Sequence, residues 1–159
     1  MSLLAIHVTL SLIEIPVGLM VIYGLITNTA HGAWTILFLT LATLTSLTGF
    51  PLAPFGFDPP RAIGVLTLAL AAGALIALYG FGLKGAWRWI FVITATATLY
   101  LDVFVVVFQA FLKIPSLHDL APTQSEPPFL VAQGATLLIF VVLGILSAIK
   151  FHPASSAKA

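Results

Sequence analysis

Long apolar stretches alternate with short polar or proline-rich segments along the whole chain. Five such stretches cover approximately residues 3–27, 33–50, 61–83, 87–113 and 128–151. Each comes close to or exceeds the roughly 20 residues with which an α-helix crosses a bilayer. A backbone in lipid must satisfy its own hydrogen bonds, so these stretches predict helices. We therefore expect an all-α polytopic membrane bundle of five transmembrane helices, with residues 1–152 as a single domain and 153–159 as a disordered tail.

The composition agrees with a membrane protein and excludes several other classes. Hydrophobic residues make up 60% of the chain and charged residues only 7%, whereas soluble domains carry about 25% charged residues. The mean hydropathy is +1.16. A net charge of +1 offers no basic face for nucleic acid, so the lipid bilayer is the expected surrounding. The absence of cysteine excludes disulfides, thiolate zinc sites and cysteine nucleophiles.

The stretch 87–113 carries a polar stripe across an otherwise apolar helix. Its members follow steps of 4, 4, 7 and 4 and so share one helix face: Thr94, Thr98, Asp102, Gln109 and Lys113. Asp102 lies near the middle, where an ionisable side chain costs about 2.5–3.5 kcal/mol on insertion scales. Such a side chain normally faces protein or water and has a partner.

Glu14 is the partner that the sequence predicts for Asp102. It belongs to a second stripe on the first stretch, formed by His7, Ser11, Glu14 and Gly18. Glu14 lies 11 residues after Leu3, and Asp102 lies 11 residues before Lys113. The two helices are expected to run in opposite directions, which places both carboxyl groups at the same depth. We expect them to face each other in a polar cavity, with Gly18 leaving room beside them.

His7, Gln109 and Gln133 are expected to form a second, shallower polar layer at the entrance to this cavity. The loop 114–127 is expected to cover the entrance. Glu14, Asp102, His7, Gln109 and Gln133 are therefore the candidate ligand- or ion-binding residues. No metal is expected, because a metal needs at least three converging donors and two helical turns separate His7 from Glu14.

The sequence leaves open the roles of the carboxyl pair and of His7. The carboxyl pair is either a proton- or cation-binding site or a hydrogen-bonded pair that fixes helix packing. His7 is either a satisfied histidine near a helix end, a metal or haem ligand, or a proton relay to Glu14. The many hydroxyls of the stretch 33–50 are expected to bond back to their own helix.

The third stretch carries a seam of small residues, Ala69, Gly73 and Ala77. Small residues at this spacing let two helix backbones approach closely. The seam predicts packing within the bundle, or a homo-oligomer formed through these three residues.

The distribution of basic residues predicts the orientation. One side of the membrane would hold Arg61 and Lys113, and the other would hold Lys84, Arg88, Lys150 and Lys158. Cytoplasmic loops carry an excess of Lys and Arg. We therefore expect a periplasmic N-terminus and a cytoplasmic C-terminus.

The segment LYLDVFVVVFQAFLKIPSLHDLAPTQSEPPFLVAQG, together with GFPLAPFGFDPPR, resembles segments of small bacterial integral membrane proteins to which no function is attached. The resemblance covers about the C-terminal half and implies a bacterial inner-membrane location. The first two helices also resemble small histidine-bearing bundles that bind haem. The third stretch, however, has no histidine that could serve as a second axial ligand.

The sequence therefore favours a small bacterial inner-membrane protein with an outward-facing polar pocket that binds a proton, cation or small molecule, for binding or transport. The alternatives are a non-catalytic accessory or packing subunit of a membrane complex, and a haem- or quinone-binding redox subunit. No catalytic residue is expected, because the chain has no nucleophile elbow, phosphate-binding glycine loop or HExxH motif. The sequence identifies no cofactor.

Overall fold

A computed structural model describes residues 2–29, 32–52 and 59–153. The fold is 83% helix, with no strand in the described ranges. The elements are α1 (Leu3–Ile26), α2 (Gly32–Gly49), α3 (Pro59–Leu75), the π-helical turn η1 (Ile76–Gly80), α4 (Ala86–Lys113), α5 (Pro115–His118) and α6 (Pro127–Lys150). Five helices are long and apolar enough to cross a membrane. The prediction of an all-α membrane bundle with five spanning helices is confirmed.

The helix ends agree with the sequence patterns except in the third span. That span was expected to continue to residue 83, but its α-helical part ends at Leu75 and the π-helical turn η1 ends at Gly80. The N–H of Leu83 closes this end by donating to the carbonyl of Ala77 at 3.0 Å. Hydrophobic periodicity does not reveal such a change of helix type. Asp58 and residues 154–159 of the expected disordered tail (153–159) lie outside the described residues, whereas Pro153 is described.

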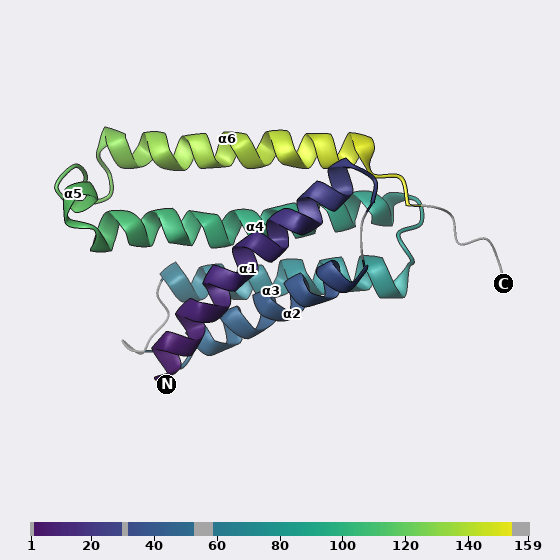
Figure 1. Cartoon of the computed structure of the whole chain (residues 1–159), viewed down its shortest axis with the longest axis horizontal. Coiled ribbons are helices and arrows are strands. Elements are labelled where there is room, and N and C mark those ends of the chain that lie inside the picture. The colour runs from purple at the N-terminus through teal and green to yellow at the C-terminus, as the bar shows by residue number, and fades with distance from the viewer. Residues whose placement is uncertain (1, 30–31, 53–58, 154–159) are drawn as a thin grey trace.

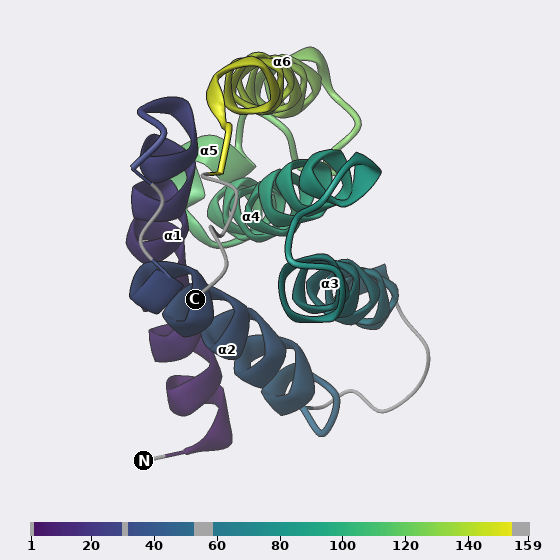
Figure 2. The same ribbon diagram turned by 90° about the vertical axis from the view of Figure 1, so that its right-hand side faces the viewer.

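The helices form a bundle in which α4 has the central position. Figure 2 shows α4 surrounded by α1, α3 and α6. Figure 1 shows α4 and α6 as an antiparallel pair, while α1 crosses the bundle obliquely from α2 toward the end of α6. We call the end that holds the start of α1 and the short helix α5 the amino end. The opposite end, where α6 finishes, is the carboxyl end.

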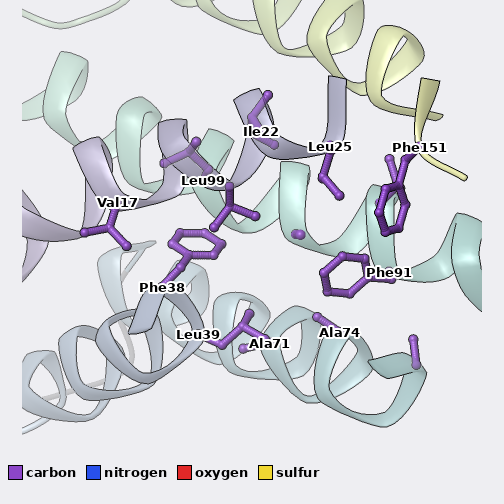
Figure 3. Packing of buried hydrophobic residues seen from close by; sticks show 14 of the residues in the cluster. Val17, Ile22, Leu25, Phe38, Leu39, Ala71, Ala74, Phe91, Leu99 and Phe151 are labelled. Atoms are coloured by element: carbon purple, nitrogen blue, oxygen red, sulfur yellow. The ribbon is translucent and has the colours of Figure 1, made fainter. Parts of the chain in front are cut away.

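The main core lies where α1, α2, α3 and α4 meet. Figure 3 shows Phe38 of α2 and Leu99 of α4 side by side beneath α1. Both are buried, as are Leu25 and Phe91 nearer the carboxyl end. Phe151, which follows α6, packs its ring 6.1 Å from the ring of Phe91. The core therefore ties the segment that follows α6 to the start of α4.

The outer surface is largely apolar, as a lipid environment requires. In α6 only Phe129, Gln133, Phe140 and Ser147 are buried, and they form one narrow stripe. The remaining faces expose large apolar side chains such as Val131, which is 70% exposed. A helix that is apolar on its exposed faces is typical of a membrane span.

The small-residue seam of the third span packs inside the chain. A Cβ atom on Gly73 would lie 3.3 Å from Cγ2 of Thr94 on α4, and Ala77 is fully buried. Ala69 is exposed, and the buried small residues of α3 are instead Ala71 and Ala74. Two of the three seam residues therefore serve packing within the bundle, and a homo-oligomer through this seam stays a prediction.

The loop between α4 and α6 folds onto the hairpin that these two helices form. Phe111, Ala121 and Phe129 make a small second core there, and Nε2 of Gln124 donates to the carbonyl of Phe108 at 2.9 Å. The loop 114–127 was expected to cover the carboxyl pair. It instead caps the ends of α4 and α6. Its described contacts lie with these two helices.

Candidate intramembrane site

The structure brings the carboxyl groups of Glu14 and Asp102 together in the middle of the bundle. Glu14 has no exposed surface, and the two carboxyl groups lie close enough to influence each other electrostatically. The sequence analysis predicted this proximity. It arises because α1 and α4 approach closely at Gly18 and Leu99, one helical turn or less from Glu14 and Asp102. The binding role of the pair stays a prediction.

The pair is buried without a conventional donor. Neither oxygen of Glu14, nor Oδ2 of Asp102, receives a hydrogen bond from an N–H or hydroxyl group within normal limits. Two ionised carboxylates in contact repel each other strongly in a low dielectric. A carboxylic acid can instead donate its O–H to a neighbouring carboxylate, and such a pair titrates as one unit. The arrangement therefore suits one shared proton.

Thr45 of α2 is a third member that the sequence analysis did not assign to the site. Its side chain faces Glu14, although Oγ1 makes no hydrogen bond of normal geometry. The hydroxyls of Thr43 and Thr48 bond back to carbonyls of their own helix, each at 2.8 Å. The expected back-bonding therefore holds for those two residues and not for Thr45. The six hydroxyl residues of α2 were the available signal, but their number and spacing do not distinguish these cases.

Thr98 adds a second hydroxyl on the face of α4 that carries Asp102. It lies one helical turn before Asp102 and is completely buried. Its Oγ1 has no hydrogen-bond partner. Buried polar atoms without partners are rare in folded proteins and call for an explanation. Those of Glu14, Thr45, Thr98 and Asp102 belong to α1, α2 and α4.

His7 joins α1 to α2 toward the amino end. Its Nδ1 lies 3.0 Å from the carbonyl oxygen of Thr45 and 3.2 Å from Oγ1 of Thr48. A carbonyl only accepts, so Nδ1 carries the proton. A Cβ on Gly49 would lie 3.3 Å from the imidazole ring. His7 thus holds the backbone of the residue whose side chain faces Glu14.

Gln133 and Gln109 do not share the contacts that His7 makes. Nε2 of Gln133 donates to the carbonyl of Phe104 at 3.1 Å, which links α6 to α4. The side-chain oxygens of Gln133 and Gln109 are buried without a partner. No described contact joins either glutamine to the carboxyl pair. The third helix that contributes a side chain at the pair is therefore α2. The sequence analysis had expected the fifth span, α6, in this place.

Gly18 does not leave room for a polar cavity. A Cβ atom there would lie 2.6 Å from Cδ1 of Leu99 and 2.8 Å from Cε2 of Phe38. The space beside the pair is filled by these two apolar side chains, and that expectation was wrong. The carboxyl pair is consequently enclosed on this side by close packing.

The donor set at the pair consists of carboxyl and hydroxyl oxygens. Among the residues that the structure describes, no group of three or more His, Asp or Glu side chains could hold a metal ion. Two carboxyls and two threonine hydroxyls are chemically suited to hold a proton or a small monovalent cation.

No protein-family model, curated protein or solved structure matches this chain. The resemblance of its C-terminal half to small bacterial membrane proteins therefore stays a prediction.

Proposed function

We propose that this chain is a bacterial inner-membrane protein in which Glu14 and Asp102 bind a proton inside the bilayer, as part of proton binding or transport. The N-terminus would be periplasmic. One observation carries the proposal: two buried carboxyl groups interact at the centre of the bundle without a conventional hydrogen-bond donor. Ionisable residues at such a depth usually mark an ion or proton pathway.

The burial of the pair favours a proton over a larger ligand. The oxygens of Glu14 and Oδ2 of Asp102 have practically no accessible surface. Leu99 and Phe38 occupy the space next to Gly18. A small organic molecule would need an open cavity, whereas a proton needs only the two oxygens. A monovalent cation would require the carboxyl groups to move apart. The hydroxyls of Thr45 and Thr98 could then complete its set of oxygen ligands.

The alternative role is structural. A carboxyl pair that shares a proton also fixes how α1 and α4 cross, and the tight packing at Gly18 supports this role. The two roles differ in their response to pH. A purely structural pair keeps its proton over the pH range in which the protein is folded, whereas a functional pair exchanges it.

Infrared difference spectroscopy of the full chain in lipid nanodiscs tests the proposal. The wild type should show a carboxyl C=O band whose intensity changes with pH. Asp102→Asn and Glu14→Gln should each abolish this band and leave the helical circular dichroism unchanged. Asp119→Asn, in the exposed loop after α5, is the matched control and should retain the band. A band that survives both core substitutions would overturn the proposal.

Transport is tested separately in liposomes. A pH-sensitive dye inside the vesicles should report proton uptake in the wild type and none in Asp102→Asn. If the infrared band responds to pH but the dye does not, the pair binds a proton without moving it across the membrane.

A further inference from the structure

A cavity of about 490 Å³ opens at the carboxyl end of the bundle, far from the carboxyl pair. Small-molecule sites in proteins have volumes of about 300–1,000 Å³. The cavity is lined by Asn28, Thr29, Gly32, Thr35, Leu78, Leu83, Phe91, Phe151, His152 and Pro153. The lining comes from four separate parts of the chain, so tertiary folding alone creates it.

The lining contains both apolar and polar side chains. Leu78, Leu83, Phe91 and Phe151 supply an apolar wall. Polar side chains come from the turn after α1 and from His152. All of these segments are helix ends or turns at one end of the bundle, which places the cavity at the level of a membrane surface. An amphipathic ligand fits such a mixed lining.

Residues 151–153 line the cavity and are held in place as a strap. The backbone N–H of His152 donates to Oδ1 of Asn28 at 2.8 Å. The guanidinium of Arg88 donates to the carbonyl of Phe151 and lies 4.2 Å from the ring centre of Trp89. Two separate elements therefore hold this segment in place, and the cavity is a built feature of the fold.

The backbone around the cavity is irregular. Among the described residues, three non-glycine positions have a positive φ, and two of them line the cavity: Asn28 at 55° and Leu83 at 59°. Leucine rarely adopts this conformation. Leu78 lies in the π-helical turn η1, and π-helical turns are frequent at functional sites. Strained positions persist where the surroundings hold them, often around ligands.

The charge at this end is positive. Lys84 follows Leu83 and Lys150 precedes Phe151, so a lysine neighbours two residues of the apolar wall. All five acidic residues of the chain belong to other regions: Glu14, Asp58, Asp102, Asp119 and Glu126. Nothing in the sequence at this end would repel an anion.

We propose that this cavity binds an anionic amphiphile, with its apolar chain against Leu78 and Leu83 and its carboxylate or phosphate at Lys84 and Lys150. The two chemical sources are a free fatty acid and an anionic phospholipid. This site is separate from the carboxyl pair and does not depend on the function proposed for that pair.

Native mass spectrometry of the full chain in a neutral detergent tests the proposal. The probes are oleate, dioleoyl phosphatidylglycerol and, as uncharged or zwitterionic controls, oleyl alcohol and dioleoyl phosphatidylcholine. One molecule of an anionic probe should remain bound per chain at concentrations at which the controls do not. Retention of oleate alone indicates a fatty acid site, and retention of phosphatidylglycerol alone indicates a phospholipid site.

Two matched pairs of variants locate the bound molecule. Lys84→Ala combined with Lys150→Ala should weaken binding on the order of tenfold or more, because each lysine near a membrane surface contributes to anion attraction. Lys113→Ala, at the amino end, should not weaken it. Gly32→Phe should fill the cavity and abolish binding. Gly134→Phe is its control, because a Cβ at either glycine meets no atom within 4 Å.

A third variant removes part of the wall without disturbing the fold. Leu83→Gly should relieve the strained φ and leave thermal stability equal or higher, while binding of the anionic probe weakens. The proposal is overturned if anionic and neutral probes bind alike. It is also overturned if the lysine pair matters but neither Gly32→Phe nor Leu83→Gly does, since the head group would then bind a charged surface alone.

Discussion

Gly18 on α1 and Leu99 on α4 lie so close that a Cβ atom on Gly18 would be 2.6 Å from Cδ1 of Leu99. Leu99 is fully buried, and Phe38 closes the same space at 2.8 Å. The glycine therefore sets how closely α1 and α4 cross. Glu14 lies one helical turn before Gly18 and Asp102 lies three residues after Leu99, so this crossing also determines the distance between the carboxyl groups.

Gly18→Ala should destabilise the bundle. Alanine is favoured over glycine in a helix by about 1 kcal/mol, but the new methyl must displace two buried side chains, and overpacking costs about 1–3 kcal/mol. We expect a net loss of up to about 2 kcal/mol in the free energy of unfolding, measured by a reversible titration in mixed micelles. Gly134→Ala is the control, because its Cβ meets nothing within 4 Å. Equal stability of the two variants would contradict a close crossing at Gly18.

Gly73→Leu should disrupt the contact between α3 and α4. A Cβ at this position already lies 3.3 Å from Cγ2 of Thr94, so a full leucine side chain would push the helices apart. We expect the free energy of unfolding to fall by about 1–3 kcal/mol or more. The thermal midpoint should fall as well. Ala69→Leu, at an exposed position of the same helix, should leave both quantities nearly unchanged. A matching loss in Ala69→Leu would point to a contact between copies of the chain instead.

Single-cysteine labelling should show that the two ends of the bundle face opposite sides of the membrane. The chain has no cysteine of its own, so each introduced thiol reports one site. Ser125→Cys should react with an impermeant maleimide in cells whose outer membrane is permeabilised. Thr29→Cys, at the carboxyl end, should react only after lysis. Both side chains are exposed. The opposite labelling pattern would reverse the orientation inferred from the basic residues.

The loop before α6 should loosen in acid because of Glu126. Desolvation raises the pKa of the Glu126 carboxyl, but hydrogen bonds from the Thr123 side chain and from backbone N–H groups of Glu126, Thr123 and Ser125 outweigh it. The pKa therefore lies below its ordinary value. A lowered pKa in the folded state means that the charged form stabilises the loop. This stabilisation is complete above the ordinary glutamate pKa, about 4.3, and is lost as the pH falls through the lower folded value.

Hydrogen exchange of the Thr123 and Ser125 amides measures this effect. These N–H groups donate to Glu126 at 3.2 and 3.1 Å. After correction for the intrinsic exchange rate, their protection should fall on acidification in the wild type. In Glu126→Gln it should be weak at every pH. Protection that is unaffected by pH in the wild type would rule out the carboxylate as its source.

Much of the fold follows from hydrophobic pattern alone. The apolar stretches predict the starts and ends of α1, α2, α4 and α6 to within two residues. A span must be apolar over a length that the bilayer sets, so its sequence signal is long and uninterrupted. The π-helical end of the third span escaped prediction, because η1 depends on local backbone geometry around Leu83 and not on apolar periodicity.

The candidate site was also predicted only in part from the sequence. Counting residues from the ends of the first and fourth spans placed Glu14 and Asp102 at one depth, since a helix rises by about 1.5 Å per residue. Rotation about the helix axes is a different matter. Which helix meets the pair depends on how side chains interlock, and this brought Thr45 to Glu14 and tied His7 to α2.

The sequence by itself determined the number of spans, the helix faces that carry the polar residues and the depth of the two carboxyls, because these properties belong to single helices. Only the tertiary structure decided that Leu99 and Phe38 fill the space beside Gly18. It also decided that Phe151 and His152 close over a cavity at the carboxyl end. Those features arise from contacts between helices distant in the chain, whose crossing angles and rotations no single-helix pattern encodes.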